Sequence, residues 1–179
     1  QLLSQVELNI EIKGKDLGLA GKVCELVQQC DQPDRIILST PWAEVGEFLK
    51  ETYPDLKRAC LTGFVDGLAW PHFSFQAPPI LMNAVNTPII HPRVQTVDHN
   101  FMDQARNRGW IVYPWVTMDA EEQDKEGLWA HLAFLGVDGL CTNYPRQLKG
   151  WLDEARFDGT SHQQALLAQR QMADRLHTG

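Results

Sequence analysis

The stretch Leu8-Asn9-Ile10-Glu11-Ile12-Lys13 has the apolar character of a β-strand, yet it carries a carboxylate and an ammonium group two residues apart. Because side chains alternate between the two faces of a strand, Glu11 and Lys13 are expected on one face and Ile10 and Ile12 on the other. Charges at the end of a buried strand are costly unless they pair with each other or bind an ion. A structural ion pair, a solvent-exposed strand edge and a functional site are therefore the open interpretations.

Size and composition indicate an ordinary globular chain. The 179 residues are enough for one domain with a hydrophobic core, and 44% of them are hydrophobic and 22% charged. The net charge of −7 and the absence of a Lys/Arg run argue against a nucleic-acid partner. No apolar run approaches the roughly 20 residues that span a bilayer. The cysteines lack zinc-ligand spacing and are expected to be reduced thiols, as in the cytoplasm: Cys24, Cys30, Cys60 and Cys141.

Short β-rich runs recur along the chain, each followed by a helical pattern, and this alternation predicts parallel strands joined by helices. The runs are 8–12, 36–39, 59–62, 89–91, 111–115 and 137–142. No glycine-rich nucleotide motif is present, which leaves a (β/α) barrel or an open doubly wound sheet. Polar or aromatic residues end most of the runs and would meet at the catalytic face of a barrel. The predicted fold class is therefore α/β, of the (β/α) TIM-barrel type.

Helices between the runs are predicted from apolar stripes and capping residues. One apolar stripe, which is expected to face the core, consists of Leu19, Val23, Leu26, Val27 and Cys30. Thr40 is expected to cap the next helix, and Asp98 a later one.

Two stretches depart from the alternation. Residues 63–86 contain Pro78-Pro79 and are expected to form a long loop with little regular structure. Residues 161–179 are rich in Gln, Ala and Leu and are expected to form a C-terminal helix. The predicted division of the chain is thus a (β/α) portion over 1–160 and a helix over 161–179.

Four strand ends resemble motifs of the glycerophosphodiester phosphodiesterase family. Asn9-Ile10-Glu11-Ile12-Lys13 resembles the Asn-Ile-Glu-[Ile/Leu]-Lys strand of that family, and Ile37-Leu38-Ser39-Thr40 is similar to its next strand. Residues 112–119 resemble its Val-x-x-Trp-Thr-Val-Asn strand, with Trp115 at the aromatic position. Residues 136–145, Gly-Val-Asp-Gly-Leu-Cys-Thr-Asn-Tyr-Pro, are similar to the closing Gly-Val-Asp-Gly-Ile-x-Thr-Asp-Tyr-Pro. Four positions depart from the pattern: Pro41, Val116, Met118 and Asn143.

The resemblance implies the later strands and helices of a (β/α)₈ barrel, that is, a partial barrel. It also implies hydrolysis of glycerophosphodiesters to glycerol 3-phosphate and an alcohol, with one divalent cation, calcium or magnesium. The family's early His-Arg-Gly, Glu-x-Asp and His-Asp motifs do not occur in these 179 residues. A chain without early strands would have open sheet edges. We therefore expect a missing N-terminal segment or a second copy of the chain to cover them.

The resemblance also assigns roles to individual residues. Glu11 would be a metal ligand, and Lys13 would offset the charge that develops on the phosphate oxygens. Trp115 would form part of the wall for the glycerol or head group, and a core aromatic that fills the barrel is the alternative. His91, apart from the resemblance, is the local candidate for substrate binding because it ends a predicted strand, and a merely hydrogen-bonded neighbour is its alternative. Because the family's acid–base pair of histidines is absent, the isolated chain is expected to be inactive.

Two other functions are compatible with the sequence. A non-catalytic barrel relative could act as a binding or interaction module, as the missing histidines favour. An unrelated (β/α) enzyme could use Glu11 and Lys13 for proton transfer. Release of glycerol 3-phosphate that requires both a divalent cation and Glu11 would distinguish the phosphodiesterase from both alternatives.

Overall fold

The computed structural model describes residues 7–65, 68–69 and 77–158, and the C-terminal helix predicted over 161–179 lies outside these residues. The chain divides into two compact units, one of residues 1–92 with 108–111 and one of residues 93–107 with 112–179. The first unit holds β1 (Leu8–Glu11), α1 (Leu17–Gln28), a 3₁₀ turn (Pro33–Arg35), β2 (Ile36–Thr40), α2 (Ala43–Thr52), β3 (Lys57–Leu61), β4 (Phe64–Val65), β5 (Leu68–Ala69), α3 (Ala77–Val85) and β6 (Ile89–His91). After a 3₁₀ turn (Val94–Thr96) come α4 (His99–Asn107), β7 (Ile111–Val112), α5 (Met118–Gln123), α6 (Lys125–Leu135) and α7 (Pro145–Asp158).

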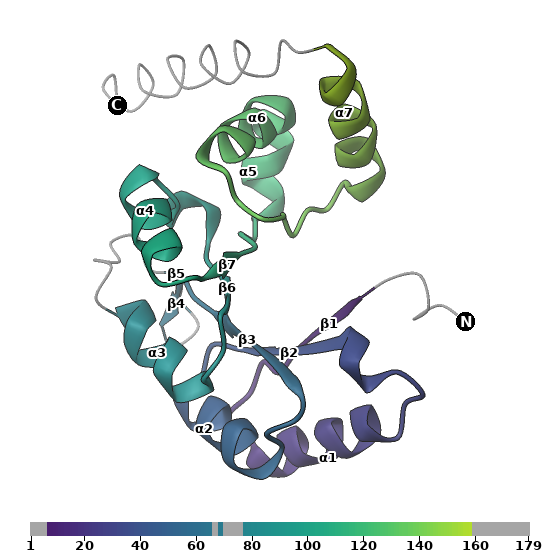
Figure 1. Ribbon diagram of the computed structural model, residues 1–179, viewed down its shortest axis with the longest axis vertical. Coiled ribbons are helices and arrows are strands. Elements are labelled where there is room, and N and C mark those ends of the chain that lie inside the picture. The colour runs from purple at the N-terminus through teal and green to yellow at the C-terminus, as the bar shows by residue number, and fades with distance from the viewer. Residues whose placement is uncertain (1–6, 66–67, 70–76, 159–179) are drawn as a thin grey trace. The chain divides into compact units, whose positions relative to one another are not determined.

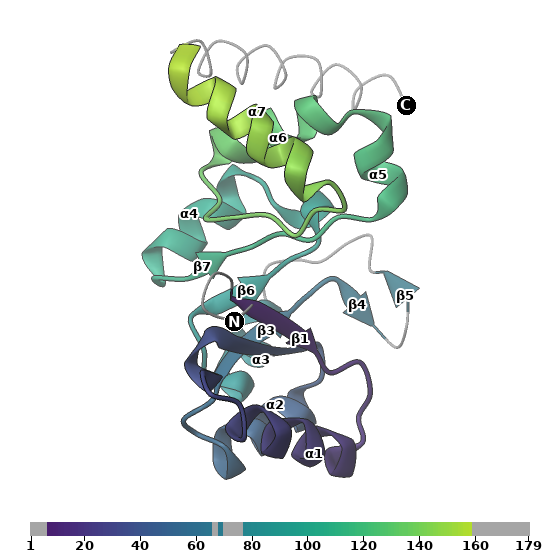
Figure 2. The same ribbon diagram turned by 90° about the vertical axis from the view of Figure 1, so that its right-hand side faces the viewer.

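The main sheet has five strands in the order β1-β2-β3-β6-β7. The pairings of β1 with β2, β2 with β3 and β3 with β6 are parallel. Strand order follows chain order without reversal, whereas a doubly wound sheet reverses at a switch point. In the first unit, α1 and α2 lie on the same side of β1–β3 (Figure 1, Figure 2). One-sided helices over sequentially ordered parallel strands are the layout of a (β/α) barrel. The predicted fold class is confirmed.

The register of the strands separates two faces of the sheet. Glu11 pairs with Ser39, and Ser39 pairs with Ala59. Further along, Leu61 pairs with His91. Paired residues of parallel strands project to the same side, and residues two apart on a strand do too. These five residues therefore belong to one face of the sheet.

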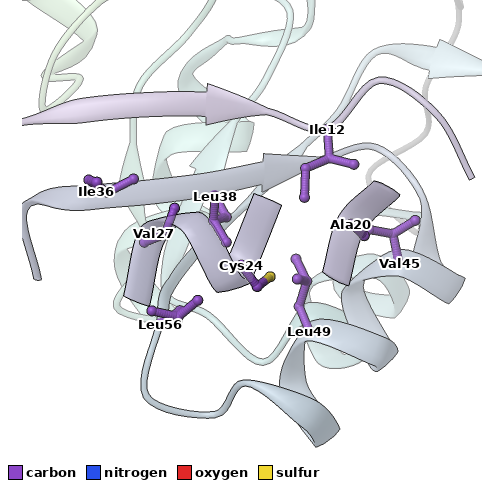
Figure 3. Packing of buried hydrophobic residues seen from close by; sticks show 9 residues of the cluster. All are labelled: Ile12, Ala20, Cys24, Val27, Ile36, Leu38, Val45, Leu49 and Leu56. Carbon is purple, nitrogen blue, oxygen red and sulfur yellow. The ribbon is translucent and has the colours of Figure 1, made fainter. Parts of the chain in front are cut away.

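The opposite face packs on the helices. Ile12 and Leu38, each one residue from the first face, form a buried core with Cys24 of α1 and Leu49 of α2 (Figure 3). The complete cluster is Ile12, Ala20, Cys24, Val27, Ile36, Leu38, Val45, Leu49 and Leu56. Glu11 and its neighbours therefore face away from α1 and α2.

The ends of α1 and α2 differ in part from the predictions. Asp16 caps α1 by accepting hydrogen bonds from two backbone amides of the first turn. The predicted stripe of α1 is buried only in part. Val27 lies in the core, but Leu19 and Leu26 are 51% and 64% exposed, because the small residues on the adjacent face of α1 pack against the sheet instead. Thr40 is not the N-cap of α2, which is Trp42; the Thr40 Oγ1 accepts the hydrogen bond of the Trp42 backbone amide at 3.2 Å.

Residues 63–86 are more regular than predicted. They contain the antiparallel pair β4–β5 and the nine-residue helix α3. Pro78 and Pro79 lie in the first turn of α3, where a missing N–H breaks no helical hydrogen bond. At Gly46 of α2, an added Cβ would lie 2.5 Å from a side-chain carbon of Val85. The packing of α2 against α3 therefore requires glycine at this position.

In the second unit, the predicted cap of α4 is confirmed: the Asp98 carboxylate accepts the hydrogen bond of the Phe101 amide at 2.7 Å. The helix α6 ends at Leu135, and its C-cap Gly136 has a φ of 77°. Figure 2 shows α5, α6 and α7 next to one another, and the rings of Trp129 and Trp151 join α6 to α7 at 6.1 Å between centroids.

The strands predicted over 111–115 and 137–142 are shorter in the structure. β7 is two residues long, and an isolated bridge joins Trp115 to Cys141. Pro114 has no N–H and cannot extend the ladder as a donor. The two segments still run side by side, because the amides of Asp138 and Cys141 donate to the carbonyls of Val112 and Pro114.

Candidate active site

The charged pair of β1 forms at the C-terminal end of the strand. Lys13 Nζ lies 2.6 Å from Glu11 Oε2. The lysine side chain is 80% exposed and the glutamate side chain 29%. An ion pair of this exposure contributes little to stability, so folding alone does not account for it. The C-terminal ends of parallel strands are also where barrel enzymes bind substrates.

The loop that carries Lys13 is fixed by the start of α2. The indole Nε1 of Trp42 donates a hydrogen bond to the Lys13 carbonyl at 2.9 Å. Lys15 Nζ lies 4.3 Å from the centroid of the Trp42 ring and 3.4 Å from a carboxylate oxygen of Glu44. The Trp42 ring packs against the core of the first unit. Its indole N–H limits where the Lys13 backbone can move.

His91 ends β6 on the same face as Glu11, and its side chain is 3% exposed. Burial lowers the pKa of His91 to about 4, although the nearby Glu11 carboxylate acts in the opposite direction. The imidazole is therefore neutral at pH 7. A group with this pKa is a weak base at neutral pH, and it suits hydrogen bonding to a ligand better than proton transfer.

Trp115, the fourth residue predicted for the site, belongs to the second unit. Its backbone bridges to Arg93 on one side and to Cys141 on the other. The Arg93 guanidinium carbon lies 5.9 Å from the centroid of the Trp115 ring. The part that Trp115 plays in substrate binding stays a prediction.

Glu121 is a buried carboxylate that sequence reasoning did not identify. It is fully buried, and one oxygen accepts hydrogen bonds from the Thr142 hydroxyl and from Trp129 Nε1 at 3.3 Å. The other oxygen accepts from the backbone and side-chain amides of Asn143 at 2.9 and 3.1 Å. Burial alone would raise the pKa of Glu121, but these hydrogen bonds outweigh burial and lower it. An ionised Glu121 thus fixes the chain just after Cys141, the bridge partner of Trp115.

The described residues do not complete a site for a divalent cation. Among residues 7–65, 68–69 and 77–158, no group of three or more His, Cys, Asp or Glu side chains is placed to hold a metal ion. Calcium and magnesium require several oxygen ligands, and Glu11 supplies one carboxylate, which is already paired with Lys13. The described residues therefore supply too few ligands to hold a divalent cation by themselves.

The comparison with protein families gives a match that covers most of the chain. The model of the glycerophosphoryl diester phosphodiesterase family matches residues 5–147, and these residues include Glu11, Lys13, His91 and Trp115. Members of this family are hydrolases and generally use a divalent metal ion. No curated protein matches the chain. In the part of the chain that the structure describes, no helix is both long and apolar enough to cross a membrane.

Solved structures show the same fold. A protein from Galdieria sulphuraria, assigned as a glycerophosphodiester phosphodiesterase, has a TM-score of 0.69 at 20% identity, with 82% of this chain and 57% of that chain covered. One from Silicibacter pomeroyi, assigned to the same activity, has a TM-score of 0.68 at 19% identity and coverages of 83% and 50%. An Oleispira antarctica phosphodiesterase in complex with the product sn-glycerol-3-phosphate has a TM-score of 0.63 at 18% identity and coverages of 82% and 55%. The chain thus spans about half the length of these structures, between 50% and 57%.

Proposed function

Because the chain belongs to the glycerophosphoryl diester phosphodiesterase family, we propose that it supplies part of a site that cleaves glycerophosphodiesters to glycerol 3-phosphate and an alcohol. The observation that carries the proposal is the Glu11–Lys13 pair at the C-terminal end of β1, on the sheet face that α1 and α2 leave uncovered. Among the other ion pairs of the first unit's described residues, Lys57–Glu7 lies at the N-terminal ends of β3 and β1, and Lys15–Glu44 joins the loop after β1 to α2.

In this proposal, Lys13 is the residue that acts on the reacting group. Its exposed ammonium group binds the phosphoryl oxygens and stabilises the negative charge that they gain during attack on phosphorus. His91, neutral at pH 7, and Trp115 bind the substrate. Glu11 orients Lys13 and is the proposed ligand to the family's cation; the choice between calcium and magnesium is left to experiment.

The isolated chain should bind the product without catalysing turnover, because it lacks the family's acid–base histidine motifs. We expect Lys13→Met to weaken binding of glycerol 3-phosphate at least tenfold, since a hydrogen bond to a charged group contributes roughly 1.5–3 kcal/mol. Isothermal titration of the full chain measures this affinity. The matched control is Lys22→Met on the exposed surface of α1, which should bind like the wild type. Equal affinity of the Lys13 variant and the control would contradict the proposal.

A non-catalytic binding module is the second candidate, and the missing histidine motifs favour it. The two candidates differ when the chain is combined with a segment that carries the early-strand motifs. A phosphodiesterase then releases glycerol 3-phosphate from glycerophosphocholine when calcium or magnesium is added, and it loses this activity with chelator or with Glu11→Ala. A binding module releases none under any of these conditions.

The open edge of β1 is the proposed site for a further strand. Among the described residues, β1 pairs only with β2, and Leu8 at its start is 42% exposed. A preceding segment of the polypeptide or a second copy of the chain would satisfy the outward amide and carbonyl groups. We expect the isolated chain to form concentration-dependent dimers in sedimentation velocity experiments. Asn9→Pro should weaken them, because the Asn9 amide points away from β2, as the Ile12 amide bonded to Ser39 indicates. A strict monomer at every concentration would exclude the second copy.

The proposed location is the cytoplasm. All four cysteines are free thiols, which suits a reducing compartment.

A further inference from the structure

The hydroxyl group of Ser39 is buried without a partner. Ser39 has no exposed surface, and among the described residues its Oγ has no hydrogen-bond partner. Most buried polar side-chain atoms in proteins are hydrogen-bonded, since an unmade bond costs the desolvation of the group. The hydroxyl of the next residue, Thr40, follows this rule and accepts the Trp42 amide. Ser39 is the exception at the end of β2, and a bound ligand would explain it.

The strand register places Ser39 beside the candidate active site. Ser39 is the direct partner of Glu11 across the β1–β2 ladder. Adjacent strands lie about 4.8 Å apart, so the two side chains are neighbours on one face. His91 belongs to the same face, through the pairing of Leu61 with His91. The Ser39 hydroxyl is thus directed to the face of Glu11 and away from the helix-covered core that contains Leu38.

The charged groups beside Ser39 indicate which kind of ligand atom its hydroxyl would contact. Glu11 Oε2 is already the acceptor for Lys13 Nζ at 2.6 Å. The hydrogen bond from Trp42 Nε1 keeps the Lys13 backbone close to the end of β2. A group held by the Lys13 ammonium is negatively charged and therefore presents acceptors. A serine hydroxyl next to it would serve as a donor.

We propose that Ser39 Oγ–H donates a hydrogen bond to a phosphoryl oxygen of the glycerophosphate group bound beside Glu11 and Lys13. This inference rests on the proposed function. It extends that function to Ser39, which is not part of the Glu11–Lys13 pair and has no predicted role. Ser39 is a ligand-binding residue in this assignment. The phosphoryl oxygen accepts the hydrogen bond for which the Ser39 hydroxyl has no acceptor among the described residues.

The test compares Ser39→Ala with wild type in two measurements on the full chain. Removing a buried hydroxyl that has no partner should leave the melting temperature unchanged or raise it. The affinity for both glycerol 3-phosphate and inorganic phosphate should fall about tenfold, as expected for a lost hydrogen bond to a charged group. Thr87→Val is the matched control. The Thr87 hydroxyl is hydrogen-bonded at the opposite end of the strands, so this variant should lose thermal stability and keep its affinity.

Each other outcome overturns the assignment. If Lys13→Met loses affinity but Ser39→Ala does not, the proposed function survives and the role of Ser39 does not. A weaker affinity for glycerol 3-phosphate with unchanged affinity for phosphate would place the hydroxyl against the glycerol moiety. A lower melting temperature of Ser39→Ala would mean that the hydroxyl already has a structural partner. Failure of the wild type to bind either anion would remove both proposals.

Discussion

Replacement of Glu121 by leucine is expected to lower the free energy of unfolding by about 3–5 kcal/mol, since several donors lose the buried carboxylate to which they are hydrogen-bonded. The carboxylate accepts hydrogen bonds from Trp129, Thr142 and both amides of Asn143. Leucine fills a similar volume but accepts none of these bonds. Urea-induced unfolding followed by tryptophan fluorescence measures the loss, and Trp129 lies directly in the network.

The adjacent Glu122 provides the control. Glu122 is exposed and accepts one hydrogen bond, from the Tyr144 hydroxyl at 3.2 Å. Glu122→Leu should therefore change the free energy of unfolding by no more than about 1 kcal/mol. Glu121→Gln should fall between the two leucine variants, because its amide NH₂ would face groups that are themselves donors. A Glu121→Leu variant as stable as Glu122→Leu would mean that the network contributes nothing.

Local periodicity was sufficient to predict the parts of the fold and site that depend on neighbours in sequence. Alternation along β1 places Glu11 and Lys13 together, and the structure has them 2.6 Å apart. The cap at Asp98 depends on the geometry of a single helix end, and it is present. Each of these predictions involves residues only a few positions apart.

The features that were missed depend on partners far along the chain. Glu121 resembles a surface residue in the first turn of a helix, and its burial follows from Thr142 and Asn143, which are about twenty positions later. The donor role of Trp42 depends on the Lys13 carbonyl, 29 positions earlier. One signal was available for Glu121: Thr142 and Asn143 offer donors just after a predicted strand and need an acceptor.

The exposed leucines of α1 show a second limit of sequence patterns. The stripe with Leu19 and Leu26 was chosen for hydrophobicity, but of its members only Val27 is buried in the core, beside the smaller Ala20 and Cys24. Small side chains allow a helix to lie close to a sheet. A hydrophobicity pattern does not show whether a helix packs on the sheet through small side chains or through large ones.

Acidification is expected to destabilise the chain through His91, by about 3 kcal/mol between pH 6.5 and pH 4. The pKa of His91 is about 4 in the folded protein, because the side chain is buried, and 6.5 is its ordinary value. Above pH 6.5 His91 is neutral in both the folded and the unfolded state, so its contribution to the free energy of unfolding does not change with pH. Between pH 6.5 and pH 4 the unfolded state binds a proton that the folded state does not, so the free energy of unfolding falls as the pH falls. Below pH 4 both states are protonated and the contribution of His91 becomes constant.

The comparison of wild type with His91→Gln isolates this contribution, because the carboxylates affect both proteins alike. Urea unfolding in chelator-containing buffers from pH 3.5 to pH 7.5 should give a smaller decrease for the variant between pH 6.5 and pH 4. Glu11→Gln provides an independent check. The Glu11 carboxylate raises the pKa of His91 against the effect of burial, so its removal should move the NMR titration of the imidazole to lower pH. Parallel stability curves for wild type and His91→Gln would show that the imidazole is accessible to protons in the folded state, and its proposed role as a neutral ligand-binding group would then fail.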